Sequence, residues 1–201
     1  MLRGPASQWD KFIFSDEKWF DANDCGVVHQ WVQGREARRR VILRERIQAP
    51  AKVLVWAAIT VGWRCFVMVV VDPATGGLNG ELYREQCLAR LRVKDLRGRV
   101  LMQDGARIHW TPANRKYIER TLGVPLLEGW PPHSADLNPV EHMWSIVQRS
   151  VSQRGPWGVE DLQRHVAEEF MKVSDETVER LVRSFRFRCE ECVAAGGAQV
   201  V

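Results

Sequence analysis

The sequence predicts an α/β fold in which a mixed five-stranded sheet is flanked by helices and followed by carboxy-terminal helices. Residues 12–20 alternate in hydrophobicity as a half-buried strand does, and residues 53–71 form an apolar run with a turn in its middle. The rest of the chain alternates short strands with helical patterns and then ends in helices alone. With 201 residues, 45% of them hydrophobic, the chain can bury a core without disulfides or a structural metal. Disordered, collagen-like and mini-protein classes are excluded.

The first strand covers residues 12–20. A period of two places Phe12, Phe14, Asp16 and Phe20 on one face, so the sequence predicts that Asp16 points toward an apolar side of the sheet. The segment 21–50 that follows is rich in Gly and Arg and has no helical periodicity. We expect it to be an insertion between the first and second core strands.

The apolar run 53–71 has two interpretations. Its nineteen residues are long enough to span a membrane, but Arg64 near the middle would cost about 2.5–3.5 kcal/mol to insert. Gly62 and Trp63 supply a turn between two runs rich in β-branched residues. A buried β-hairpin is therefore the favoured interpretation, and the membrane span is the alternative.

The remaining elements follow from periodicity, capping residues and breakers. Thr111 can cap a helix with Pro112 at its first position, and Asn138 opens another helix in the same way. Breaks are predicted at Pro131-Pro132 and Gly155-Pro156. The predicted helices are 80–93, 112–121, 138–151, 159–172 and 175–193, and the last two strands are 100–103 and 124–127.

The charge of the chain is concentrated in one segment. The net charge is +4, and residues 35–46 alone carry six arginines against two glutamates, 6 − 2 = +4. Such a stripe is either a solvated surface or a phosphate-binding footprint, and arginine favours phosphate because its guanidinium binds phosphate oxygens in a bidentate manner. The six arginines are Arg35, Arg38, Arg39, Arg40, Arg44 and Arg46.

The five cysteines do not form a secreted disulfide framework, because their number is odd and no signal peptide precedes them. We expect an intracellular protein, nuclear if the source is eukaryotic. Cys189 and Cys192 are a single C-x-x-C pair on a helical pattern, which favours a structural role over a zinc site.

Three carboxylates are candidate functional residues, and each also has an ordinary structural explanation. Asp16 can be a polar residue on a solvated strand, Asp104 half of an Asp-Gly turn, and Glu141 the partner of Asn138 in a capping box. Together, however, Asp16 and Asp104 share strand faces with apolar residues, and gathering carboxylates at the edge of a core is costly unless they protonate or bind cations. Oxygen ligands select Mg²⁺ or Mn²⁺, and a pair of these ions supports phosphoryl transfer on nucleic acid.

Three segments resemble the catalytic motifs of mariner-like DDE transposases. They are FSDEKWF around Asp16, MQDGARIH around Asp104 and WPPHSADLNPVEHMW around Glu141, with 141 − 104 − 1 = 36 residues between the last two acids. The resemblance runs from Trp9 to Cys189. It implies a ribonuclease H-like fold, with Asp16, Asp104 and Glu141 as catalytic ligands of two Mg²⁺ or Mn²⁺ ions.

The resemblance also implies partners and a division of the chain. The partners would be transposon-end and target DNA, with TA target choice, and a second copy in a homodimer; no membrane is expected. Residues 1–154 would be the catalytic core, with the insertion 21–50, and residues 155–201 a helical extension of it. The insertion matches a family loop that contacts DNA and the partner subunit, which gives the arginine stripe a phosphate-binding role.

The sequence departs from the family near Asp104. Gly105 replaces a common Asn and Arg107 a common Pro; Arg107 can contact DNA or simply reach solvent. His109 stands where the family has a histidine, as a supporting residue that either positions substrate or makes a structural hydrogen bond. Asn138 is a second supporting residue. Only fifteen residues precede Asp16, so we expect either the catalytic part of a longer protein or a shortened derivative without end-reading modules.

Three functional hypotheses follow. The first is metal-dependent DNA cleavage and strand transfer. The second is a domesticated DNA-binding or interaction module with weak or no catalysis. The third is a nuclease of the same fold that acts on RNA–DNA hybrids or branched DNA.

Overall fold

The computed structural model of the chain describes residues 6–22, 52–72, 74–156 and 158–199. A four-stranded sheet in the order β3-β2-β1-β4 forms its centre. The strands are β1 (Phe12–Asp21), β2 (Lys52–Thr60), β3 (Trp63–Val69) and β4 (Val100–Met102). β1 pairs antiparallel with β2 and parallel with β4, so the sheet is mixed as predicted.

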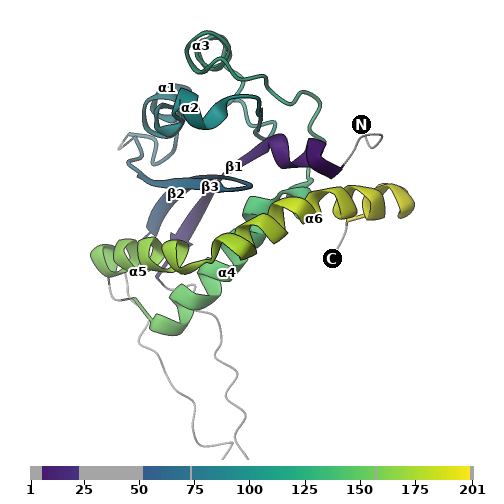
Figure 1. Cartoon of the computed structure of the whole chain (residues 1–201). Coiled ribbons are helices and arrows are strands. Elements are labelled where there is room, and N and C mark those ends of the chain that lie inside the picture. Colours follow the sequence, from purple (N-terminus) through teal and green to yellow (C-terminus); the bar gives the residue numbers. More distant parts are fainter. Residues whose placement is uncertain (1–5, 23–51, 73, 157, 200–201) are drawn as a thin grey trace, which may run out of the picture.

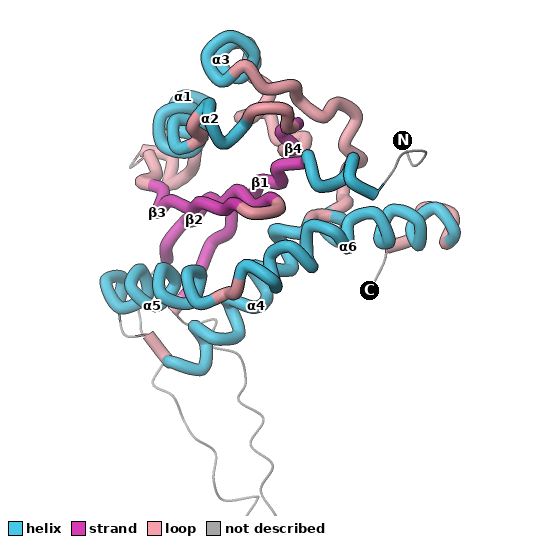
Figure 2. The backbone as a smooth tube through the Cα atoms, viewed as in Figure 1, coloured by secondary structure: helices cyan, strands magenta, loops and turns pink. Residues whose placement is uncertain are grey.

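Helices cover both faces of this sheet. Figure 1 shows α4 (Pro139–Arg154), α5 (Gly158–Lys172) and α6 (Asp175–Ala194) on one face. The other face carries α1 (Gly80–Leu82), α2 (Val93–Leu96) and α3 (Pro112–Tyr117). Figure 2 shows the same arrangement as strands between two helical groups. Short turns of 3-10 or π type fill in at Ala6–Lys11, Tyr83–Cys87, Leu88–Arg90, Ile118–Leu122 and Ala135–Leu137.

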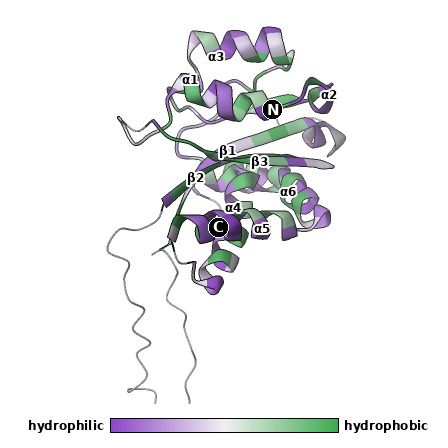
Figure 3. Cartoon of the chain, turned by 90° about the vertical axis from the view of Figure 1, so that its left-hand side faces the viewer, coloured by the Kyte–Doolittle hydropathy of each residue, from purple (hydrophilic) through white to green (hydrophobic). Residues whose placement is uncertain are grey.

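The alternation of β2 explains why two layers of helices are needed. Val55 and Ala57 face the core shared with α4, α5 and α6, whereas Leu54 and Trp56 face the core beneath α1 to α3. The hydrophobic colour runs along the strands in Figure 3, as expected for a sheet covered on both sides. In the larger core the side chain of Trp144 is completely buried and meets Phe20 edge-on at 5.7 Å between ring centroids.

The apolar run 53–71 forms the predicted hairpin of β2 and β3, with Gly62 at φ 74° in the turn. A left-handed φ of this kind is one that glycine adopts without steric cost. No helix within the described ranges is long and apolar enough to cross a bilayer.

The predicted fifth strand is reduced to a single bridge. Leu126 pairs parallel with Leu101, whose N–H donates to the Pro125 carbonyl at 2.8 Å and whose carbonyl accepts from Leu127 N–H at 2.8 Å. Pro125 has no N–H to donate, so the ladder is not extended on that side. The sheet is therefore four-stranded among the described residues, not five-stranded.

The predicted helix 80–93 is also divided. It begins at Gly80, capped by the Asn79 side chain, widens into a π turn at Tyr83–Cys87 and ends in a 3-10 turn before Leu91 turns to extended backbone. The helices predicted from Pro112 and Asn138 begin where their capping residues indicate.

Candidate active site

Three elements bring the three acids together. Asp16 lies in β1, Asp104 follows the last residue of β4 by two positions, and Glu141 lies in the first turn of α4. Phe14 pairs with Met102 in the parallel ladder. Asp16 follows Phe14 by two residues and Asp104 follows Met102 by two residues, so both acids continue on the same face. The carboxyl end of the parallel pair therefore presents Asp16 and Asp104 side by side.

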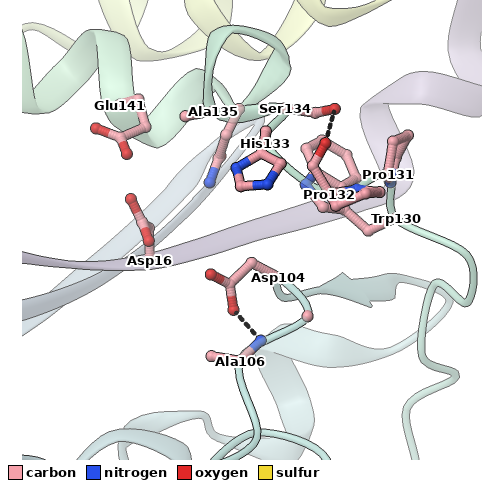
Figure 4. Close-up of a pocket in the computed structure, with 12 residues that line it drawn as sticks. Asp16, Asp104, Ala106, Trp130, Pro131, Pro132, His133, Ser134, Ala135 and Glu141 are labelled. Atoms are coloured by element: carbon pink, nitrogen blue, oxygen red, sulfur yellow. Dashed lines mark hydrogen bonds between the residues drawn. The ribbon is translucent and has the colours of Figure 1, made fainter.

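Asn138 positions the third acid. Its side-chain oxygen accepts from Val140 N–H at 3.1 Å and caps α4, while its amide nitrogen donates to the Ser15 carbonyl at 3.5 Å. The start of α4 is thereby tied to β1 one residue before Asp16. Glu141 is directed toward Asp16, as Figure 4 shows.

The three acids line one cavity of about 370 Å³. Asp16 and Glu141 face each other across it, with Asp104 on the adjoining wall (Figure 4). The opposite wall belongs to the segment before α4, where His133 has a φ of 57°, the only positive φ of a non-glycine residue in the part of the chain described. The rest of the lining is Gly105, Ala106, Trp130, Pro131, Pro132, Ser134, Ala135 and Asn138.

Of the three acids, Asp16 is the one whose ionised form is disfavoured by its surroundings. Its Oδ2 is buried without a hydrogen-bond partner. Burial, followed by the charges of Glu141 and Glu17, raises the pKa of Asp16 to about 9. In the absence of a cation this carboxyl therefore holds a proton at neutral pH.

Asp104 has the opposite environment. Its Oδ1 accepts from Ala106 N–H at 2.9 Å and lies 2.7 Å from His109 Nδ1, and its carbonyl accepts from Trp110 Nε1–H at 2.6 Å. The interaction with His109 lowers the pKa of Asp104 despite partial burial. The side chain remains 47% exposed, so this carboxylate is ionised and open to the cavity.

His109 is buried between two carboxylates. Only 2% of its side chain is exposed, and its Nε2 lies 3.1 Å from Glu17 Oε1. Burial lowers the pKa of His109, but the contacts with Asp104 and Glu17 outweigh it and raise the pKa to about 10. His109 is therefore an imidazolium that is not among the described residues lining the cavity, and of its two predicted roles the contacts with two acids favour the structural one.

The donor set fits a hard cation. The unpartnered Oδ2 of Asp16 and the repulsion between Asp16 and Glu141 are both relieved by a positive ion, and all three side chains offer oxygen. Within residues 6–22, 52–72, 74–156 and 158–199, no three Asp, Glu, His or Cys side chains already converge as a closed metal centre. The acids surround the cavity without meeting at one point.

The candidate DNA-binding residues fall into two groups. Arg107 is exposed on the loop after Asp104. The six arginines of the stripe, with most of the predicted insertion 21–50, lie outside the described residues.

Two features of the site were missed from the sequence. Glu17 follows Asp16 directly, yet strand alternation gives it the appearance of an ordinary charge on the other face. The segment from Trp130 to Ala135 is part of the third motif and contains a predicted break, but the sequence did not indicate that it forms a wall of the cavity.

Comparison with known proteins identifies the family. The family model described as "DDE superfamily endonuclease" matches residues 11–163. The chain belongs to this family. DDE endonucleases are named for the acids of their motifs, and the predicted relationship to DDE transposases is thus confirmed.

Curated relatives of this DDE endonuclease are transposases. The Tc3 transposase of Caenorhabditis elegans is 30% identical over 198 residues, which cover 95% of this chain and 58% of the relative. The Tc1 transposase of the same organism is 24% identical over 203 residues, covering 98% of this chain and 72% of that protein. The chain thus spans little more than half of the Tc3 transposase.

Solved structures confirm the ribonuclease H-like fold. The catalytic domain of Mos1 mariner transposase superposes with a TM-score of 0.70 at 18% identity, covering 97% of this chain and 86% of that one. A pre-cleavage Mos1 transpososome superposes with a TM-score of 0.78 at 18% identity, covering 96% of this chain and 58% of that one. At this identity the likeness concerns the fold.

Proposed function

We propose that this DDE endonuclease is the catalytic part of a transposase that cleaves DNA and transfers the cut strand, using two Mg²⁺ or Mn²⁺ ions. The observation that carries the proposal is the cavity shared by Asp16, Asp104 and Glu141, in which one buried carboxylate oxygen has no partner. The 30% identity to a transposase over nearly the whole chain supports the same activity.

In this proposal Asp16, Asp104 and Glu141 would together hold the two ions. When bound, such ions activate the attacking oxygen and stabilise the leaving oxygen of a phosphodiester. The protein contributes a preformed position for each carboxylate: β-pairing fixes the two aspartates, and the capped start of α4 fixes Glu141. Trp130 and Pro131 form part of the wall of the cavity.

The proposed partners are DNA and a second copy of the chain. Mos1 transposase has been solved as a paired-end complex with the left transposon end and as a strand transfer complex. By extension we propose transposon-end and target DNA, a homodimer, and phosphate contacts from Arg107 and the arginine stripe.

The test is Mn²⁺ binding by calorimetry, followed by nicking of supercoiled plasmid. Asp16→Asn, Asp104→Asn and Glu141→Gln should each lose Mn²⁺ affinity and cleavage while retaining the fold, because each removes a carboxyl ligand with almost no change in volume. Glu119→Gln, at an exposed position on the opposite side of the sheet, serves as the matched control. If wild type neither binds Mn²⁺ nor cuts DNA, a DNA-binding or interaction module replaces the enzyme. If the wild-type protein cleaves an RNA–DNA hybrid or branched DNA in preference to plasmid, a structure-selective nuclease replaces the transposase.

A further inference from the structure

A buried chain of three side chains connects the first strand to the second aspartate. Glu17 Oε1 lies 3.1 Å from His109 Nε2, and His109 Nδ1 lies 2.7 Å from Asp104 Oδ1. Both ring nitrogens are therefore engaged by carboxylates, and the ring cannot turn without losing both contacts. We propose that Glu17 is a positioning residue that acts through His109 to fix the Asp104 carboxylate in the orientation required for metal binding; this inference rests on the proposed function.

The exposed fractions of the three side chains indicate which of them can reach the cavity. The Asp104 side chain is 47% exposed and faces the cavity, His109 is 2% exposed, and Glu17 is 16% exposed on the far side of the ring. Only Asp104 of the three is among the described residues that line the cavity. Glu17 therefore does not touch the cavity, and although its charge also acts on Asp16, its contact with Asp104 passes through the imidazole.

The surroundings hold His109 in place for this task. The ring of Tyr83 packs against the imidazole with 4.5 Å between centroids. The Tyr83 hydroxyl donates to Gln103 Oε1 at 3.0 Å, and Gln103 Nε2 donates to the His109 carbonyl at 3.2 Å. Gln103 is fully buried, so the backbone and the ring of His109 are both anchored.

Strand geometry explains why Glu17 is suited to the role. Consecutive residues of a strand point to opposite faces, so β1 presents Asp16 to the cavity and Glu17 to the other side of the sheet. Glu17 pairs with Trp56 of β2, whose side chain belongs to the core beneath α1 to α3. β1 thus supplies the proposed ligand Asp16 on one face and, through Glu17 and His109, contacts the proposed ligand Asp104 from the other face. Removing a group that hydrogen-bonds to a metal-ligating side chain commonly changes metal affinity or activity by about 10–100-fold. Glu17 lies one contact further out, on the histidine that contacts Asp104.

The test compares Glu17→Ala and Glu17→Gln with wild type by crystal structure and by Mn²⁺ calorimetry. In metal-free crystals of Glu17→Ala we expect His109 to leave its 2.7 Å contact and the Asp104 carboxylate to rotate. Mn²⁺ affinity should fall by about 10–100-fold. Glu17→Gln keeps an oxygen that accepts from the ring and should restore most of both properties. Glu119→Gln is the control and should match wild type.

A double mutant separates positioning from a general loss of stability. If Glu17 acts only through His109, Glu17→Ala combined with His109→Ala should bind Mn²⁺ no more weakly than His109→Ala alone, whereas independent effects would add. Thermal unfolding of every variant identifies any that fails to fold. If Glu17→Ala does not fold, the Asp104 orientation and Mn²⁺ affinity of Glu17→Gln test the positioning role instead.

The outcomes distinguish this inference from the proposed function. An unchanged Asp104 rotamer in folded Glu17→Ala overturns the positioning role, and so does additivity in the double mutant. A rotated Asp104 in a chain whose wild type binds no Mn²⁺ retains the positioning role and rejects the metal-dependent enzyme.

Discussion

Replacing Asp16 with asparagine is expected to stabilise the metal-free protein near neutral pH, although it removes a proposed ligand. In the folded chain the pKa of Asp16 is about 9, against an ordinary value of 3.8, because of burial first and then the charges of Glu141 and Glu17. Between these pH values unfolding releases a proton from Asp16. Asparagine has nearly the same size but no proton to lose and no charge to bury.

The magnitude follows from proton linkage. Below pH 3.8 the carboxyl is protonated in both states, so wild type and the Asp16→Asn variant differ little on this account. From pH 3.8 upward the folded chain binds more protons than the unfolded chain, so wild-type stability falls by about 1.4 kcal/mol per pH unit until about pH 9. At pH 7 this gives 3.2 × 1.4, at most about 4–5 kcal/mol. Relaxation of water around a partly exposed carboxylate reduces the difference to about 2–3 kcal/mol.

The assay is urea unfolding in EDTA at a series of pH values from about 4 to 8, with Glu119→Gln as control. The Asp16→Asn variant should exceed wild type by a margin that widens as pH rises, with an unchanged dependence on urea. A margin that is absent, reversed or independent of pH would refute the electrostatic reasoning. Addition of Mn²⁺ should then narrow the margin, because only wild type gains a bound ion.

Three further substitutions probe the core, the start of α4 and the DNA surface. Trp144→Ala should lower the free energy of unfolding by about 3–5 kcal/mol in urea titrations, since the indole is completely buried, and a loss below about 1 kcal/mol would contradict the packing. Asn138→Ala should cost about 1 kcal/mol through the lost cap and weaken Mn²⁺ binding in calorimetry, because Glu141 loses its tie to β1; unchanged affinity would exclude that positioning. Arg107→Ala should reduce the salt dependence of duplex binding, followed by fluorescence anisotropy, by about 0.9 in slope, and an unchanged slope would remove Arg107 from the phosphate contacts.

Local patterns predicted much of the fold because each element carried its own signal. Alternation identified β1 and the face of Asp16, Gly62 marked the hairpin turn, and the caps at Thr111 and Asn138 fixed where two helices begin. Local sequence patterns gave a wrong prediction where hydrogen bonds to other segments determine the secondary structure. Pro125 can accept but not donate, so its strand is only a bridge. The π turn at Tyr83–Cys87, in which Leu88 N–H reaches the Tyr83 carbonyl, has no counterpart in the apolar periodicity.

The site was predictable to the extent that it lies in motifs. The spacing and neighbours of Asp16, Asp104 and Glu141 identified the acids that line the cavity. The role of Glu17 could not be deduced, because it depends on a histidine 92 residues away that reaches the same side of β1. Alternation places Glu17 opposite Asp16, but only tertiary contacts distinguish a buried partner from a solvated charge.

The charges around the cavity explain where a cation has most to contribute. Asp104 is partly compensated, since the buried imidazolium of His109 lies 2.7 Å away, although the same ring also contacts Glu17. Asp16 has no such partner: its nearest charges are acidic, and its Oδ2 is buried and unbonded. The protein thus provides an internal counter-charge near Asp104 and none near Asp16, which faces Glu141. A divalent ion bound by Asp16 would supply the missing positive charge and displace the proton that Asp16 otherwise holds, which links the instability of the metal-free site to its affinity for metal.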